Sequence, residues 1–229
     1  NKYFIWTHPV HEILTPIDQN LDYEIIDLPQ IQLNHKADIN KSRSSYLPLL
    51  ELSVREHPED DRNVHYLGRE YMYHKQYDKA IETLTRHLSL PTAVWDIERC
   101  ASLRYIAACF GAKGDKKRQE EYLIRAILEA DYVREPYYEL AVFYYGNDDF
   151  LKSAFTFNEM LKINQRELNY MSSPACWGSS PYDYLSMCYY ELKDYKKALN
   201  FVNKAIELNK NDERLINNRD YFLKQLYKD

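Results

Sequence analysis

The chain has 229 residues, of which 45% are hydrophobic and 28% charged, with a formal net charge of −5 at pH 7. This apolar content suffices for a packed core, which excludes a disordered chain, and the interspersed charges lack the basic block that a nucleic acid partner would require. No apolar run approaches the ~20 residues of a membrane-spanning helix, so we expect no membrane span.

The first 41 residues differ in pattern from the rest of the chain. Short β-branched or aromatic stretches broken by prolines predict strands at residues 3–7, 11–14, 23–27 and 31–34. Four short strands cannot bury both faces by themselves. They therefore either pack on the first helices or form the edge of an upstream sheet domain. The chain begins at Asn1 without a signal-peptide layout, as expected of a fragment of a longer protein.

A helix is predicted over residues 44–56, within a linking segment of residues 42–60. It places Tyr46, Leu50 and Val54 on one face. We expect it to end before Pro58, because the residue that precedes a proline avoids helical geometry.

Residues 61–229 contain an internal repeat. Apolar residues at spacings of three, four and seven predict pairs of helices, each with one apolar stripe. A small residue recurs at the helix crossing, at intervals of 39, 34 and 45 residues, near the ~34-residue period of helical-hairpin repeats. These equivalent small residues are Gly68, Ala107, Ala141 and Ser186.

Two connections are longer than the others, and a final helix follows the last repeat. The longer connections surround residues 90–92 and span residues 164–181. From Asp212 onward, apolar residues at helical spacing predict a helix that covers the last repeat. The predicted fold is mainly α: a superhelical array of about four hairpins with a C-terminal capping helix, preceded by a short β-containing segment.

The repeat resembles the tetratricopeptide repeat. The matching residues lie at the start of the first helix, at the turn and at the exit of the second helix: Leu67, Gly68, Tyr71, 77–80 and 205–209. The resemblance is most specific in the first and fourth copies. In the second copy Lys116 and Gln119 replace the usual aromatic and small residues, so we expect that hairpin to pack differently.

A second resemblance concerns the order of segments. Residues 9–12 (Pro-Val-His-Glu), then 35–36 and 41–43, lead into repeats with a long insertion. This order is similar to the C-terminal end of bacterial family-2-type glycosyltransferases, in which an A-type catalytic domain precedes tetratricopeptide repeats. The resemblance implies that His11 helps to bind a divalent metal beside the diphosphate of a nucleotide sugar, with Glu12 near the leaving group.

The chain itself lacks most of such a catalytic site. It contains no Asp-x-Asp sequence, and sixty residues are too few for a nucleotide-binding half. On a strand, His8 and His11 would point to opposite faces, so they form no metal cluster. No Gly-rich phosphate loop or nucleophile elbow occurs. We therefore expect no complete active site and no cofactor in this chain; the metal and the nucleotide sugar belong to a full-length enzyme.

The groove of the array is the other candidate site, because the first helix of each hairpin lines the concave face. Arginine pairs with anions, and tyrosine rings stack on sugars or prolines. We therefore expect a protein, peptide or glycan partner, and the alternative is that these side chains are merely solvated. The predicted groove residues are Arg62, His65, Arg69, Tyr73, Arg104, Tyr138, Tyr145, Asp183 and Tyr190.

Four widely spaced cysteines complete the list of chemically distinctive residues. Cys109 and Cys188 lie among apolar neighbours, which indicates buried hydrophobic side chains and a reducing, cytoplasmic compartment.

Two functions remain open. The chain is either the C-terminal scaffold of a glycosyltransferase or a stand-alone tetratricopeptide adaptor without sugar chemistry.

Overall fold

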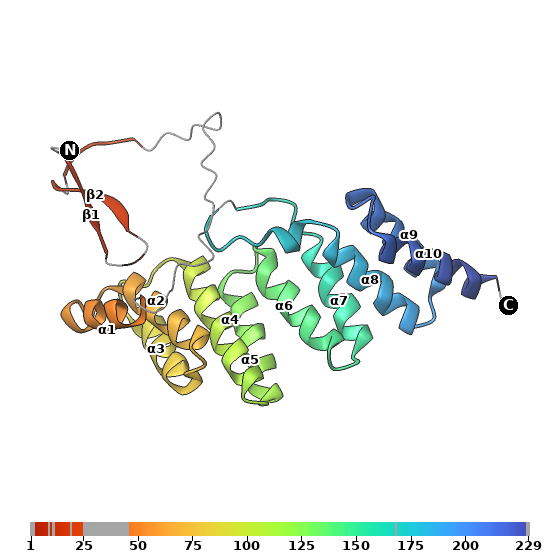
Figure 1. Ribbon diagram of the computed structural model, residues 1–229, viewed down its shortest axis with the longest axis horizontal. Helices are drawn as coiled ribbons and strands as arrows, with labels where there is room; N and C mark the ends of the chain where they lie inside the picture. The colour runs from red at the N-terminus through yellow and green to blue at the C-terminus, as the bar shows by residue number, and fades with distance from the viewer. Residues whose placement is uncertain are drawn as a thin grey trace.

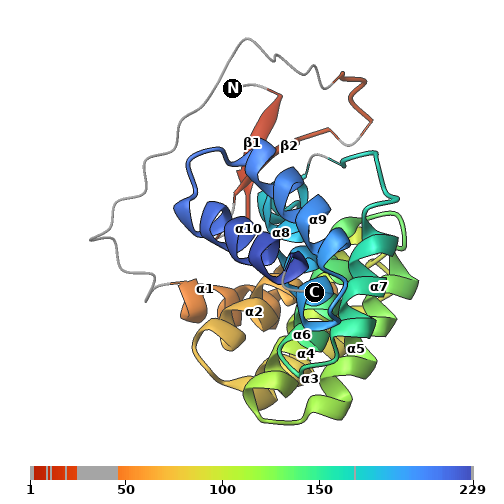
Figure 2. The same ribbon diagram turned by 90° about the vertical axis from the view of Figure 1, so that its right-hand side faces the viewer.

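A computed structural model of the chain shows a row of paired helices preceded by a β-hairpin (Figure 1). The structure describes residues 3–8, 10, 12–18, 20–24, 46–167 and 169–227. The first and second helices of the four pairs are α2 (Asp61–Tyr73) with α3 (Tyr77–Ser89), α4 (Asp96–Ala112) with α5 (Lys116–Glu129), α6 (Arg134–Tyr145) with α7 (Phe150–Met160), and α8 (Ser180–Glu191) with α9 (Tyr195–Leu208). Successive pairs are rotated relative to one another, as expected of a superhelix (Figure 2).

The turns inside the four hairpins repeat one backbone feature. Each contains a residue with positive φ, seven positions after the small residue that marks the repeat: Lys75, Gly114, Asp148 and Lys193, with φ of 59°, 79°, 59° and 61°. The left-handed conformation reverses the chain after the first helix. In the last three turns the next residue, an aspartate, accepts a hydrogen bond from a backbone N–H of the second helix, as an N-cap does.

The small residues permit close contact between the two helices of a hairpin. A Cβ atom on Gly68 would lie 2.5 Å from Leu84 Cγ, which is closer than side chains pack. In the second hairpin a Cβ on Gly111 would lie 2.7 Å from the Gln119 amide group. This explains how Gln119 can replace the small residue that is usual at this position of the repeat. The second copy places a glycine, Gly111, on α4 opposite the larger side chain on α5.

The capping helix and the long connection also follow the prediction. Helix α10 (Glu213–Leu226) begins after Asp212, whose carboxylate accepts from two backbone N–H groups, and buries Leu215 and Phe222 against α9. Residues 161–179, here named the insertion, connect α7 to α8 and include a short 3-10 helix, Pro174–Trp177.

The N-terminal segment differs in part from the expectation. Strands β1 (Phe4–Thr7) and β2 (Ile13–Pro16) form an antiparallel hairpin. The second strand therefore starts two residues later than expected, and His8 lies beyond β1 with φ of 71°. Residues 23 and 24 form no strand, and the remainder of 23–27, all of 31–34 and the predicted helix start at 44–45 lie outside the described residues.

This segment contacts the array through one buried side chain. Val10 packs in a cluster with Leu50 and Val54 of α1 (Tyr46–Glu56) and with residues of α2. The predicted apolar face of the linking helix is thus confirmed, and one of the two alternatives for the N-terminal segment, packing on the first helices, holds at Val10.

All four cysteines are buried free thiols, in agreement with the expectation from their neighbours. Within the described part of the chain, none of the helices combines the length and the apolar character required to cross a bilayer.

Candidate functional site

The first helices α2, α4, α6 and α8 each contact the next, as do the helices that line the concave surface of such an array. Its N-terminal half, from α2 to α5, carries three of the predicted arginines. The guanidinium groups of Arg62 and Arg69 lie over the ring of Tyr66, at 4.9 and 4.4 Å from its centroid. Tyr73 remains half exposed at the end of α2.

Arg104 of α4 makes an internal contact. It forms an ion pair with Glu139 of α6, with Nε 2.9 Å from Oε1, and its side chain is only 13% exposed. The Glu139 carboxylate raises the pKa of the Arg104 guanidinium against the opposing effect of burial. Arg104 therefore joins two neighbouring repeats and offers little surface to a partner.

The insertion is held by the first turn of α6. Arg134 donates to the carbonyl oxygen of Ile163 from Nε (2.9 Å) and Nη2 (2.6 Å), and to that of Cys176 from Nη1 (3.1 Å). Its guanidinium also lies 3.8 Å from the ring centroid of Trp177. A buried arginine with several carbonyl partners is a strong clamp, because its charge strengthens each hydrogen bond.

Tyr170 of the insertion extends this covering to α2 and α4. Its ring stacks on Tyr66, with 6.2 Å between centroids, and lies 5.4 Å from Trp95. Its hydroxyl donates a hydrogen bond to the Glu98 carboxylate. The insertion therefore contacts α2 and α4 through Tyr170, and sequence reasoning located its position but not this contact.

The C-terminal half, from α6 to α10, carries the other predicted groove residues. Tyr138 hydrogen-bonds Ser180 at 2.6 Å, and the rings of Tyr145 and Tyr184 lie 5.0 Å apart. These tyrosines are partly exposed.

On the two last elements of this half, Asp183 of α8 pairs with Arg214 of the capping helix at 2.8 Å. The ring of Tyr190 packs against Phe222 and against the half-exposed Tyr221. The capping helix thus takes part in the concave surface, a role that the sequence analysis did not assign to it.

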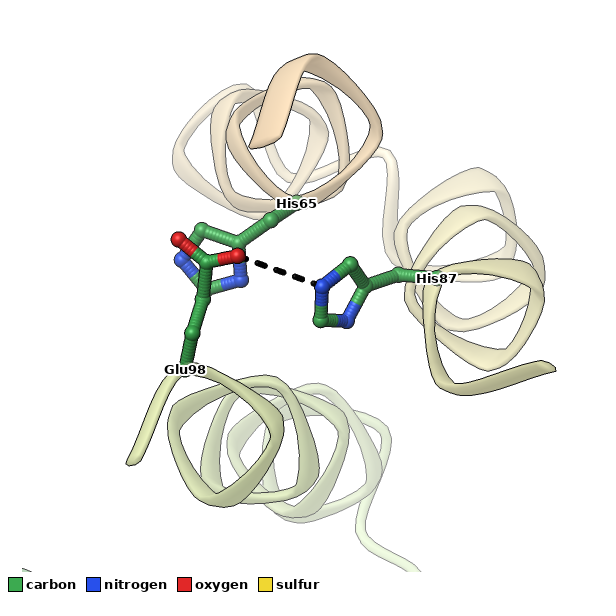
Figure 3. Close-up of side chains that lie close together, drawn as sticks. All are labelled: His65, His87 and Glu98. Atoms are coloured by element: carbon green, nitrogen blue, oxygen red, sulfur yellow. Dashed lines mark ion pairs between the residues drawn. The ribbon is translucent and has the colours of Figure 1, made fainter. Parts of the chain in front are cut away.

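The prediction that His65 lines an open groove is wrong, because its side chain is 0% exposed. It belongs to a polar cluster inside the N-terminal half, where His65, His87 of α3 and Glu98 of α4 point toward one another (Figure 3). The Ser102 hydroxyl oxygen lies 2.8 Å from His65 Nδ1 and 2.9 Å from His87 Nδ1. His87 Nε2 lies 3.3 Å from Glu98 Oε1.

Burial sets the charge state of this cluster. Desolvation lowers the pKa of His65 to about 3, so its imidazole is neutral at pH 7. Burial by itself raises the pKa of Glu98, but the contacts with His87 and with the Tyr170 hydroxyl lower it to about 2. Glu98 is therefore an ionised carboxylate in the interior of the array.

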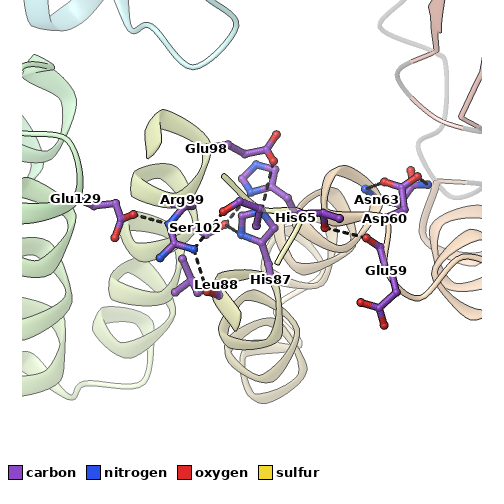
Figure 4. Close-up of polar contacts among 12 residues, drawn as sticks. Glu59, Asp60, Asn63, His65, His87, Leu88, Glu98, Arg99, Ser102 and Glu129 are labelled. Carbon is purple, nitrogen blue, oxygen red and sulfur yellow. Dashed lines mark hydrogen bonds and ion pairs between the residues drawn. The ribbon is translucent and has the colours of Figure 1, made fainter. Parts of the chain in front are cut away.

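Backbone contacts fix the helices around the cluster (Figure 4). Arg99 donates from Nη1 to the carbonyl oxygens of Leu88 and Ala93 and forms an ion pair with Glu129. These contacts hold the end of α3 and the start of α4 in place.

Nothing in the sequence pattern identified His87, Glu98 or Ser102. They lie on two helices of different repeats, so only the packing of the hairpins brings them together. Conversely, His11 lies outside the described residues, and its predicted metal role stays a prediction.

Comparison with known proteins supports the repeat architecture. Residues 180–212, which contain α8 and α9, match the family model of the tetratricopeptide repeat. No significant match was found among curated protein sequences. Several solved structures share the fold at low sequence identity.

The C-terminal part of a TPR repeat-containing protein from Cytophaga hutchinsonii aligns with a TM-score of 0.63 and 16% identity, over 80% of this chain and 67% of that one. MamA aligns with a TM-score of 0.58 and 18% identity, over 79% and 99%. YrrB, described as a TPR protein with an unusual peptide-binding site, aligns with a TM-score of 0.56 and 12% identity, over 77% and 83%. Residues 180–212 are thus a tetratricopeptide repeat, and the array has the fold of a tetratricopeptide-repeat protein.

Proposed function

We propose that the chain is a protein-binding scaffold whose concave surface, in its C-terminal half, holds an extended segment of a partner protein. The observation that carries this proposal is the row of partly exposed side chains on α6 and α8. Tyr138 and Tyr145 are seven residues apart on α6, and Asp183 and Tyr190 are seven apart on α8, so each pair lies on one helix face.

The chemistry of this row fits an extended peptide. Tyrosine provides a large apolar ring at low cost in conformational entropy together with a hydroxyl that exchanges hydrogen bonds with a backbone. Tyr145 already makes an edge-to-face contact with Tyr184, and Tyr190 stacks on Phe222, so the rings are ordered before a partner arrives. Preordered aromatic side chains lower the entropic cost of binding.

The N-terminal half is less suited to this role, because the insertion and internal ion pairs occupy its side chains. A partner that spans the whole surface would have to displace Tyr170 from Glu98. We therefore assign the main contact to α6, α8 and α10. The peptide-binding description of YrrB, which shares the fold, is compatible with this assignment.

A random peptide library selected against the full chain tests the proposal. The dissociation constants of the selected peptides are then measured with the unchanged chain and with Tyr145→Ala and Tyr190→Ala. We expect each substitution to weaken binding about tenfold or more, as removal of an aromatic contact residue does at interfaces. Phe155→Ala is the matched control, because Phe155 is 66% exposed on the second helix α7.

Selected peptides that bind equally well to Tyr145→Ala and Tyr190→Ala, or that lose affinity only with Phe155→Ala, would overturn this assignment. Selective binding of oligosaccharides by the same tyrosines, without any peptide binding, would instead identify a glycan as the partner.

A second proposal concerns an attached enzyme. We propose that the array serves as the C-terminal scaffold of a nucleotide-sugar-dependent glycosyltransferase, in which His11 contributes to a divalent metal site. The supporting observation is the β-hairpin. It exposes Ile5, Trp6 and Leu14, although Val10 in the connecting loop is anchored on α1 and α2. Apolar side chains of this kind suit contact with a larger sheet domain.

The coding sequence before Asn1 distinguishes this proposal from a stand-alone adaptor. A nucleotide-sugar domain with paired aspartates would support the enzyme. A start codon only a few residues upstream would exclude the enzyme and leave the adaptor as the function.

A further inference from the structure

We propose that His65, His87 and Glu98 bind one divalent cation of the Zn²⁺ class in the interior between α2, α3 and α4. One potential ligand atom from each side chain lies within 4.8 Å of those from the other two. The 3.3 Å between His87 Nε2 and Glu98 Oε1 matches the ~3.4 Å that separates two ligands of a tetrahedral zinc ion. A separation at the 4.8 Å limit must shorten by roughly 1.4 Å to reach this value.

Each of the two imidazoles has one nitrogen beside Ser102 and one nitrogen without a hydrogen bond among the described residues. Both Nδ1 atoms lie within hydrogen-bond distance of Ser102 Oγ, and both Nε2 atoms are buried without a hydrogen bond among the described residues. A hydroxyl oxygen has two lone pairs, so it can accept from both Nδ1–H groups and leave both Nε2 lone pairs for a cation. A fixed second nitrogen is the usual arrangement of metal-binding histidines.

The buried charge of Glu98 also calls for a cation. The side chain is 5% exposed, and its contacts from described residues come from His87 and from the Tyr170 hydroxyl, none from a lysine or arginine. A buried carboxylate needs several partners to replace the water that it loses on folding. A divalent ion would bind this carboxylate and one nitrogen of each imidazole at once.

The residue types of the cluster indicate which ion fits. Two imidazoles with one carboxylate are typical of zinc and related ions rather than of Mg²⁺ or Ca²⁺, which prefer oxygen ligands alone.

The rival explanation is a chain of hydrogen bonds without an ion. In that arrangement His65 Nδ1–H donates to Ser102, the Ser102 hydroxyl donates to His87 Nδ1, and His87 Nε2–H faces Glu98. This relay leaves His65 Nε2 without a hydrogen bond among the described residues. The two explanations differ in what Zn²⁺ does to the purified chain.

The test uses the full chain, from which EDTA first removes any bound metal. The chain is then unfolded in urea and refolded with Zn²⁺ or Co²⁺ present, so that the ion reaches the site before it is buried. We expect one equivalent of bound zinc by elemental analysis, an intense visible Co²⁺ spectrum of tetrahedral type, and a higher melting temperature with Zn²⁺. His87→Gln and Glu98→Gln should each weaken zinc binding tenfold or more, as measured by competition with a chromophoric chelator.

His74→Gln is the matched control, since His74 Nε2 lies 3.5 Å from Glu70 Oε1 at the surface end of α2. It should retain the full zinc affinity. Tyr170→Phe should also retain it, because this change removes a contact of Glu98 but no proposed ligand. The absence of stoichiometric zinc binding by the unchanged chain would overturn the proposal, as would binding that His87→Gln and Glu98→Gln leave intact. The first of these readouts needs no variant, so a variant that fails to fold does not obscure the result.

Discussion

The two halves of the concave surface use the same repeat in different ways. In the N-terminal half, Arg104 pairs with Glu139, and Tyr170 of the insertion is bound to Glu98. In the C-terminal half, Tyr145 and Tyr190 are ordered by ring contacts and remain partly exposed. Side chains of the first helices thus join neighbouring repeats in one half and remain partly exposed in the other.

The insertion between α7 and α8 contributes to this difference. Because the chain returns from the C-terminal half to α2 and α4, Tyr170 stacks on Tyr66 and binds Glu98. A periodic sequence pattern cannot reveal this, since the covering residues come from another part of the chain.

The largest expected effect is that of removing the clamp of the insertion. Arg134→Ala eliminates three hydrogen bonds to buried carbonyl groups and the contact with Trp177, and we expect it to lower the free energy of unfolding by about 4 kcal/mol. Urea denaturation measures the loss, and hydrogen exchange should show new exposure at α2 and α4. Arg166→Ala is the control, because Arg166 is exposed and lies 5.9 Å from Trp177. A decrease in the free energy of unfolding below ~1 kcal/mol for Arg134→Ala would show that Arg134 does not hold the insertion in place.

The second expectation is that acid lowers the stability of the metal-free chain. The pKa of His65 is about 3 in the folded state against its ordinary value of 6.5, so below pH 6.5 the unfolded state binds a proton that the folded state does not. Stability is therefore full above pH 6.5 and is lost as the pH falls toward 3, by on the order of 3 kcal/mol at pH 4. Glu98 acts in the same direction, with stabilisation complete above pH 4.5 and lost toward pH 2.

Hydrogen exchange at pH 7 and pH 4 locates this effect. Amides of α2 to α4 should lose protection first, while those of α8 to α10 keep it. Equal losses of amide protection in both halves would show that the acid effect does not arise in the His65 cluster. His65→Gln should reduce the pH dependence of the free energy of unfolding.

A smaller effect is expected at the closest helix contact. Gly68→Ala places a Cβ 2.5 Å from Leu84 Cγ, and the shift of Leu84 should cost about 2 kcal/mol of unfolding free energy. Gly146→Ala, whose Cβ would meet no atom closer than 3.5 Å, is the control and should change stability by less than ~0.5 kcal/mol. Thermal or urea unfolding that ranks the two variants in the opposite order would show that Gly68 does not limit the contact.

The smallest expected effect lies at a helix start of the C-terminal half. The Asp194 carboxylate accepts from the backbone N–H of Lys197, and this hydrogen bond, together with that from the Lys197 side chain, lowers the pKa of Asp194. Asp194→Ala should cost about 1 kcal/mol, whereas Asp194→Asn should retain most of the cap. Equal losses for Ala and Asn would indicate that the charge, and not the cap, provides the stability.

The sequence alone determined the periodic part of this protein. Small residues at Gly68, Ala107, Ala141 and Ser186 and apolar residues at helical spacing predicted the four hairpins, the capping helix and the two longer connections. These features depend on contacts between residues close in sequence, so local patterns encode them. The same holds for the buried face of α1, although the exact limits of the strands near His8 and Ile13 were not predicted.

Only the tertiary structure decided which groove positions are covered and which polar groups meet. Tyr170 reaches Glu98 across 72 positions of sequence, and His65, His87 and Ser102 come from three helices. Such contacts depend on how the insertion folds back and on how the repeats rotate, and no spacing rule describes either. The physical reason is that side chains of distant segments compete for the same interior space, and that competition is resolved only when the whole array is packed.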